Sequence, residues 1–236
     1  MPVDDRKLHQ YHSKNLSSLD SALLHTALAA KEAIRLRQHK QVTIFNRMYA
    51  LTLGAWAEVR LLKLLYDTGG FPVVIRRQVE ASDTLYERWE MCIEKAFEHK
   101  YNRPTDSLPK TAKLRYELII KYLETHLKPT ITIRNKLAHG QWIYPLNCDL
   151  SSVEESAKAS LEQQNIMILQ YKKNMLNAIA SVIHDLVVSR PTFERDFDKH
   201  FQKVDDIERD ISTRTYKSYV KELIKRFERG KQIRNA

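Results

Sequence analysis

The amino-acid sequence predicts an all-α protein, an up-and-down helical bundle followed by a long C-terminal helical extension. Glycine (5 of 236 residues) and proline (7) are both scarce, so few positions favour tight turns. Apolar residues recur at three- and four-residue steps over long stretches, which is the period of one face of an α-helix. We expect a bundle over residues 1–190 and a basic extension over residues 191–236.

Residues 17–40 and 42–66 predict the first two helices, and the second should be central because its middle is apolar over more than half its circumference. Gly54 within it costs about 1 kcal/mol relative to alanine, which a close approach of another helix would offset. Glu58 lies in the same apolar stretch, and a buried carboxylate needs a partner. Arg134 is the candidate partner; the other interpretation places Glu58 at the solvent edge of the helix.

Residues 67–72 contain the sequence Asp-Thr-Gly-Gly-Phe-Pro, the clearest break in the chain. The short apolar run at 73–75 is compatible with a strand, although it is too short to change the fold class. Residues 84–101 and 111–126 predict a third and a fourth helix from their apolar periodicity.

Pro129 should interrupt the fourth helix, because proline disfavours helix at the residue before it. Thr130 or Thr132 could then cap a short new helix that ends at Gly140. Trp142 and Tyr144, which follow, either stack on bases or pack in a core or interface, and packing is the more frequent role.

Residues 152–189 predict one long helix, which Arg190-Pro191 stops, and residues 192–229 predict a final, more polar helix. Its end is strongly basic and is the best electrostatic candidate for an RNA-binding arm. An equally weighted alternative is a solvated amphipathic helix packed on the bundle. The RNA-binding candidates are Lys217, Lys221, Lys225, Arg226 and Arg229.

The overall charge favours a polyanionic partner, since the formal net charge is +10. General solubility is the alternative explanation. Cys92 and Cys148 have no Cys/His spacing of a zinc site and suggest reduced thiols in the cytosol. The N-terminus lacks a secretory pattern, and the apolar runs are too short to span a bilayer. We therefore expect a cytoplasmic protein with no membrane association, metal or cofactor.

One stretch, Ile133-Arg-Asn-Lys-Leu-Ala-His-Gly140, combines groups that are suited to phosphodiester chemistry without a metal. Arg134 offers a planar fork of donors for phosphate oxygens, and Asn135 offers both donors and an acceptor. His139 can take and give a proton near neutral pH. The competing interpretation is structural, because Lys136, His139 and Gly140 also fit an ordinary helix C-terminus.

The pattern Arg134-Asn135-x-x-x-His139 resembles the Arg-x4-6-His motif of the HEPN superfamily, in which a polar residue, often Asn, follows the arginine. The Ala-His-Gly ending is also similar to many members. The resemblance implies a bundle of HEPN type and a metal-independent endoribonuclease. The RNA 2′-hydroxyl would attack the adjacent phosphorus and leave a 2′,3′-cyclic phosphate and a 5′-hydroxyl.

Carried over residue by residue, the resemblance makes His139 the acid–base group, Arg134 the phosphate contact and Asn135 the residue that orients them. Candidate supporting residues are Glu58, Lys136, Trp142 and Tyr144. The family also implies a homodimer with a composite cleft, a toxin–antitoxin or antiphage role and an antitoxin or defence-system partner. HEPN toxins silenced by adenylylation carry tyrosine two residues after the histidine, where this chain has Gln141, so that regulation is not expected.

Arg134 and His139 are separated by about 140° around a regular helix of 3.6 residues per turn, so one copy of the motif looks like half a site. The alternative function is a non-catalytic helical adaptor that binds RNA or protein with the same surface. A DNA-binding regulator is weaker, because no clear helix-turn-helix pattern is present.

Overall fold

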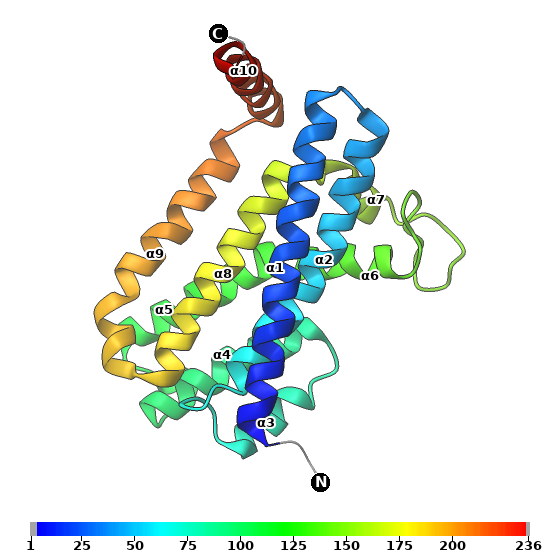
Figure 1. Cartoon of the computed structure of the whole chain (residues 1–236). Helices are drawn as coiled ribbons and strands as arrows, with labels where there is room; N and C mark the ends of the chain where they lie inside the picture. Colours follow the sequence, from blue (N-terminus) through cyan, green and yellow to red (C-terminus); the bar gives the residue numbers. More distant parts are fainter. Residues whose placement is uncertain (1–3, 235–236) are drawn as a thin grey trace.

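The computed structural model describes residues 4–234, with side chains described through residue 230; residues 1–3 and 235–236 lie outside it. The prediction of an all-α helical bundle is confirmed (Figure 1). Within the described residues the only β pairing is one isolated bridge between Leu146 and Val153. No helix in this part of the chain is long and apolar enough to cross a membrane. The α-helices are α1 (Asp5–Arg35), α2 (His39–Leu65), α3 (Val73–Glu80), α4 (Leu85–Tyr101), α5 (Lys110–Tyr122), α6 (Lys128–Ala138), α7 (Glu155–Gln163), α8 (Ile166–Val188), α9 (Arg190–Thr213) and α10 (Tyr216–Arg234).

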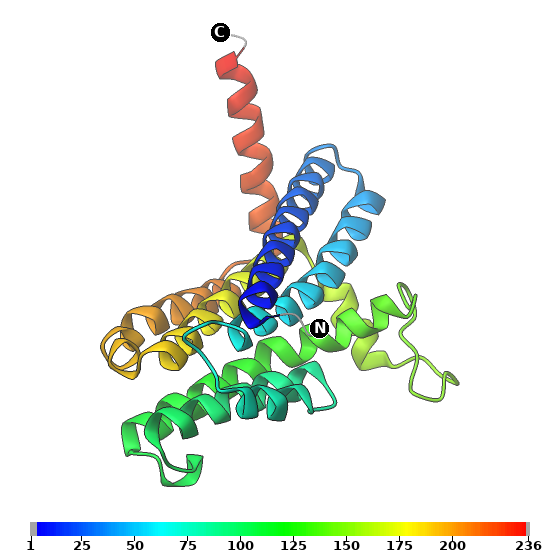
Figure 2. The same cartoon turned by 60° about the horizontal axis from the view of Figure 1, so that its bottom comes forward.

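The long antiparallel pair of α1 and α2 runs along one side of the bundle, with α8 beside α1 (Figures 1 and 2). Helix α1 begins twelve residues before the predicted start at residue 17, because tertiary contacts hold its polar first turns. Asp5 accepts a hydrogen bond from the buried Arg76 at 2.6 Å, and the His12 ring lies 5.3 Å from the Tyr66 ring. The helix ends at Arg35, ahead of Arg37, whose φ is 56°.

The interpretation of residues 73–75 as a strand is wrong, because they form the first turn of α3. Pro72 precedes this helix in an extended conformation. Arg76 and Val79 are three residues apart and both buried, which requires helical rather than alternating spacing.

Pro129 does not separate two helices as predicted. A π-helical turn, Leu123–Leu127, joins α5 directly to α6, with Pro129 in the first turn of α6. A π turn changes the pairing of backbone groups, so the missing proline N–H is accommodated without a break. Thr130 and Thr132 donate to the carbonyls of His126 and Lys128 and therefore do not cap a new helix.

Two predicted long helices are each divided in the structure. Residues 152–189 contain α7 and α8, separated at Gln164 and Asn165, and the Asn165 side chain accepts from the Ile168 N–H as the N-cap of α8. Residues 192–229 contain most of α9 and most of α10, which are separated at Arg214 and Thr215.

The C-terminal extension also divides into two parts with different packing. Helix α9 lies along α8 and buries four apolar side chains in the same core as the rest of the bundle, namely Phe193, Phe197, Phe201 and Val204. Helix α10 projects from the end of the bundle near the α1–α2 turn (Figure 2). The compact bundle therefore continues to the end of α9, beyond the boundary expected at residue 190.

Candidate functional site

Helix α6 carries the Arg134–His139 motif and crosses α2 at Gly54. A Cβ atom added to Gly54 would lie 2.3 Å from Cγ and 2.6 Å from Cβ of Arg134. Real atoms do not approach so closely, so only glycine permits the arginine side chain to pass at this point. The close approach expected at Gly54 is therefore present, and Arg134 itself occupies the space.

The guanidinium of Arg134 is held by two acceptors. Its Nη2 donates to Glu58 Oε2 at 3.0 Å, and its Nη1 donates to Asn135 Oδ1 at 3.0 Å. Glu58 and Gly54 are four residues apart and lie on the same face of α2. The expected contact between Glu58 and Arg134 is thus present, and the arginine side chain has a defined direction.

His139 is the C-terminal cap of α6 and is exposed to solvent. Gly140, with φ of 77°, follows it, and its N–H donates to the Leu137 carbonyl while the Gln141 N–H donates to the Lys136 carbonyl. These two hydrogen bonds and the positive φ define a Schellman ending, which favours glycine. The structural interpretation of Gly140 is confirmed, and this ending leaves the imidazole at the surface.

An open groove of about 700 Å³ lies between α6 and the loop that follows it. Thr132, Asn135 and His139 line it from α6 at helical spacing, and the loop provides the opposite wall. Arg134 is not a lining residue; it faces α2. Within one chain the motif therefore places Asn135 and His139 in one groove and joins Arg134 to them through the Asn135 side chain.

The remaining candidates anchor the loop after α6. Lys136 donates to the Leu146 carbonyl and pairs with Glu154 at 2.8 Å. The indole of Trp142 donates to the Leu137 carbonyl at 3.0 Å and packs partly buried against the core. These contacts give Lys136 and Trp142 a structural role in shaping the groove wall.

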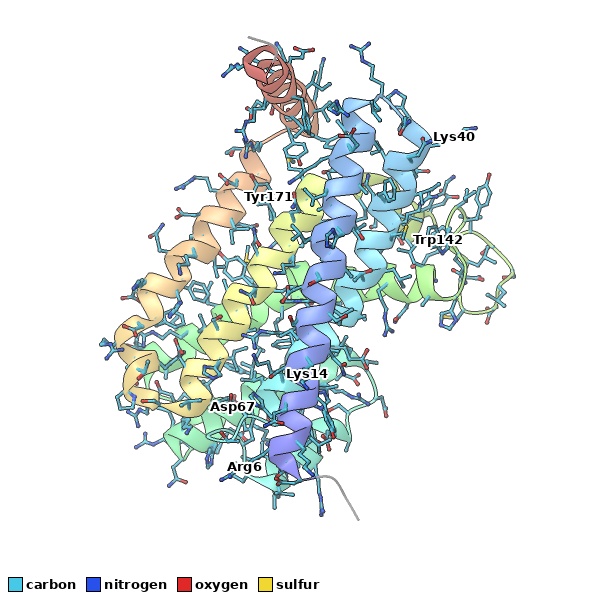
Figure 3. All side chains as sticks on the ribbon, in the orientation of Figure 1. Arg6, Lys14, Lys40, Asp67, Trp142 and Tyr171 are labelled. Carbon is cyan, nitrogen blue, oxygen red and sulfur yellow. The ribbon has the colours of Figure 1, made fainter. Side chains whose placement is uncertain are left out.

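Tyr144 is the one candidate of this loop whose ring is open to solvent, with 60% of its surface exposed. The Lys158 ammonium lies 5.8 Å from the centre of that ring. Figure 3 shows Trp142 on the loop beyond α6, on the same side of the view as Lys40 at the start of α2. The loop after α6 and the N-terminal end of α2 therefore lie on one side of the molecule.

The five basic candidates of α10 all have exposed side chains. Lys217, Lys221 and Lys225 follow one another at four-residue steps and so form a stripe along the helix. The opposite side carries Tyr219, Val220 and Leu223, which pack partly against the core. Helix α10 is therefore amphipathic, and its charged side faces solvent beyond the bundle.

Two features near these candidates were not anticipated. Asn46 is buried at 7% exposure within a separate pocket, and Lys172 is largely buried in α8. Burial lowers the pKa of the Lys172 ammonium to about 8. Asn46 lies three and four residues before Tyr49 and Ala50, which are both buried, and this helical spacing was the available sequence signal for it.

The comparisons with known proteins gave no match of any of three kinds: no protein-family model, no curated protein and no solved structure matches this chain. The likeness to the HEPN superfamily therefore depends on the motif residues themselves.

Proposed function

We propose that this protein is a metal-independent endoribonuclease and that Arg134, Asn135 and His139 form its catalytic group. The observation that carries the proposal is the fixed direction of Arg134, which Gly54 admits, Glu58 holds and Asn135 joins to the groove of His139. Glu58 and Asn135 use two of the five N–H donors of the guanidinium, and the donors that remain are suited to phosphate oxygens.

The residues at the two ends of the motif have different roles in the reaction. His139 removes the proton of the RNA 2′-hydroxyl or donates one to the leaving 5′-oxygen, and a positioned histidine contributes about 10²–10⁴-fold in rate. Arg134 stabilises the charge that develops on the phosphorane oxygens. The products are a 2′,3′-cyclic phosphate and a 5′-hydroxyl.

A homodimer completes the proposed site. Arg134 faces α2 whereas His139 lines the groove on the other side of α6, so one chain presents the two groups in different directions. A second copy supplies the missing half of a cleft in which both groups reach one phosphate. The basic side of α10, with its exposed lysines, then adds backbone contacts to the RNA.

The biological setting belongs to the same proposal. A ribonuclease of HEPN type acts in the cytoplasm, in a toxin–antitoxin or antiphage system, where a partner protein restrains it. The second candidate function is a non-catalytic adaptor that binds RNA or protein. It is favoured by the structural roles of Lys136 and Trp142, which hold the loop rather than a substrate.

One experiment separates the two functions. The purified protein, in a buffer with EDTA and at a concentration where it is dimeric, is mixed with labelled single-stranded RNAs of varied sequence. The nuclease function requires cleavage by the wild type and its loss in His139→Ala, while His25→Ala, which removes an exposed histidine of α1, cleaves normally. Tight binding without cleavage of any RNA would establish the adaptor.

A further inference from the structure

Residues 141–154 form the α6–α7 loop, which projects from the side of the bundle (Figures 1 and 2). Three of its apolar side chains are open to solvent: Ile143 exposes 59% of its surface, Tyr144 60% and Leu150 65%. Removing apolar surface from water is favourable by about 25 cal/mol per Å², so these side chains gain stability against another apolar surface. Apolar side chains gathered at the surface are typical of a contact with another protein.

Hydrogen bonds close the α6–α7 loop into a hairpin. Leu146 and Val153 form its antiparallel bridge, and the Asn147 side chain holds the tip. Asn147 Oδ1 accepts from the Ser151 N–H at 2.9 Å, and its Nδ2 donates to the Ser152 hydroxyl at 3.0 Å. A surface that is ordered before binding loses little conformational entropy when a partner packs against it. The loop is therefore suited to a specific contact.

Leu150 lies at the tip of this hairpin in a left-handed conformation. Its φ is 56°, and its N–H donates to the Asn147 carbonyl at 3.1 Å. A residue other than glycine in this region costs about 1–3 kcal/mol. Glycine would adopt the same φ without steric cost but would leave no apolar group at the tip. The strained conformation thus presents a large apolar side chain where the turn itself does not require one.

The α6–α7 loop lies in the longest interval of the sequence without lysine or arginine. The 21 residues between Lys136 and Lys158 contain neither, although the chain has 39 of them and a net charge of +10. Asp149 is the only charged residue between positions 137 and 153. A nucleic acid or an acidic protein is attracted by cations, which this surface lacks.

A second copy of the chain fits such a surface. Two strongly basic chains repel each other unless they meet through a region without cations. In a two-fold dimer each patch contacts the same patch of the other copy, and the centres of protein interfaces are depleted of charge. An apolar loop with almost no charge is complementary to itself in this sense.

The groove of His139 is bordered by the same loop. Cys148 and Leu150 line it together with His139. Among the described lining residues Lys136 is the one lysine or arginine, and its ammonium pairs with Glu154 at 2.8 Å. The groove of one chain therefore lacks a free lysine or arginine for a phosphate. A second copy packed on the loop lies at the open side of this groove.

We propose that two copies of this chain pack α6–α7 loop against α6–α7 loop about a two-fold axis, an inference that rests on the homodimer of the proposed function and names the surface on which it forms. Ile143, Tyr144 and Leu150 of both copies lie at the centre of the contact. Cys148, two residues before Leu150, lies near its equivalent in the second copy. Helix α10 projects from another part of the bundle, so its basic side stays free for RNA (Figure 2).

The test is the mass of the full-length chain in solution, measured by light scattering without RNA from micromolar to submillimolar concentration. The wild type should have twice the chain mass of 27.7 kDa. Leu150→Asp and Ile143→Asp should each weaken dimerisation at least tenfold, because each places an unpaired carboxylate in an apolar contact. Aspartate adopts a positive φ more readily than leucine, so Leu150→Asp should fold. Leu114→Asp, at a leucine of α5 that is 57% exposed, should dimerise like the wild type.

Cys148 reports the arrangement of the two copies. Cys92 is buried and Cys148 is exposed, so a short bis-maleimide reagent reacts with Cys148. The wild type should give a cross-linked pair at a concentration where it is dimeric. Leu150→Asp should give at least tenfold less of this pair, and Cys148→Ser should give none. A dimeric wild type that is not cross-linked has its contact elsewhere, and this result would overturn the proposal.

The outcomes for the surface and for the ribonuclease are separate. Loss of the dimer in Leu150→Asp, with no RNA cleavage by the wild type, supports the surface and removes the nuclease. Cleavage by the wild type, with an unchanged dimer in both Leu150→Asp and Ile143→Asp, keeps the nuclease and overturns the surface. A wild type that stays monomeric throughout also overturns it, and RNA binding lost in Leu150→Asp but not in Leu114→Asp would then assign the loop to RNA.

Discussion

The guanidinium of Arg134 donates to the carboxylate of Glu58 across 3.0 Å and joins α6 to α2. Because 31% of the arginine and 40% of the glutamate side chain remain exposed, the ion pair contributes only about 0–1 kcal/mol to stability. Its importance is geometric, since it fixes where the cation points. Gly54, one turn earlier on α2, is the position that permits this approach.

Replacing Gly54 with alanine should destabilise the protein, although alanine normally favours a helix by about 1 kcal/mol. The new Cβ would lie 2.3 Å from Arg134 Cγ, so α2 and α6 must separate. We expect the free energy of unfolding to fall by about 1–3 kcal/mol in urea titrations. The control is Gly69→Ala, whose Cβ would meet no atom closer than 3.9 Å. Equal stability of the two variants would contradict the close approach.

The variant Glu58→Gln should distinguish a role of Glu58 in positioning Arg134 from a role in the stability of the protein. Glutamine keeps an acceptor near Arg134 but removes the charge, so the free energy of unfolding should change by less than about 1 kcal/mol. RNA cleavage should fall about tenfold, because Arg134 is held less firmly. The measurement is the single-turnover rate, with Glu117→Gln on the exposed side of α5 as the control. An unchanged rate would show that Glu58 does not position the arginine.

The burial of Lys172 should give the protein an unusual dependence of stability on pH. Burial lowers the pKa of its ammonium from 10.5 to about 8 in the folded protein, so between pH 8 and 10 the unfolded chain binds more protons than the folded one. Stability from this group must therefore increase as the pH rises through that window, by on the order of 1 kcal/mol from pH 8 to 9.5.

The check on Lys172 is urea unfolding at pH 7.5 and pH 9.5. Lys172→Met should be more stable than the wild type at the lower pH and should lose the increase at the higher pH. Lys7→Met, at an exposed position of α1, should retain the wild-type dependence. A wild-type stability that falls steadily from pH 8 would contradict the assignment.

The basic stripe of α10 should contribute phosphate contacts. For single strands each lost contact reduces the slope of log K against log salt by about 0.7, so Lys221→Gln/Lys225→Gln should reduce it by about 1.4. Fluorescence anisotropy with a labelled RNA at several salt concentrations measures this slope. Lys7→Gln/Lys14→Gln removes the same charge from α1 and should leave it unchanged. Equal slopes for both double variants would exclude α10 from the RNA contact.

The two parts of the C-terminal extension should differ in their effect on folding. Ending the chain after Thr213 removes α10, none of whose described side chains is fully buried, and should preserve a cooperative thermal transition. Ending it after Ser189 also removes Phe193 and its three buried companions of α9, each worth several kcal/mol, and should abolish that transition. Circular dichroism melting of both truncated chains tests this difference.

The sequence was sufficient to predict the structure where apolar periodicity and local chemistry agree. It predicted the helical class, the central α2, the close approach at Gly54, the Glu58–Arg134 pair and the ending at Gly140. Most of these depend on a constraint within a few residues. Arg134 was a candidate partner for Glu58, and the structure shows both the pair and a glutamate side chain that stays 40% exposed, as the solvent-edge interpretation expected.

The sequence was insufficient where tertiary contacts determine the ends or the continuity of a helix. Helix α1 extends to Asp5 because Arg76, far along the chain, holds its first turn. The π turn before Pro129 preserves a helix that proline would normally end. The division at Asn165 is an N-cap signal inside a continuous apolar pattern, and periodicity alone cannot distinguish it from an exposed asparagine.

The catalytic role of the Arg134–His139 motif is tested most directly by the termini of the RNA products. An RNA with distinguishable labels at its 5′ and 3′ ends is incubated with dimeric wild type and with His139→Ala in the presence of EDTA. The account predicts a 2′,3′-cyclic phosphate and a 5′-hydroxyl with the wild type, no products with His139→Ala, and resistance of an RNA with 2′-deoxyribose at the cleaved position. Intact RNA with the wild type, or undiminished cleavage by His139→Ala, would contradict it.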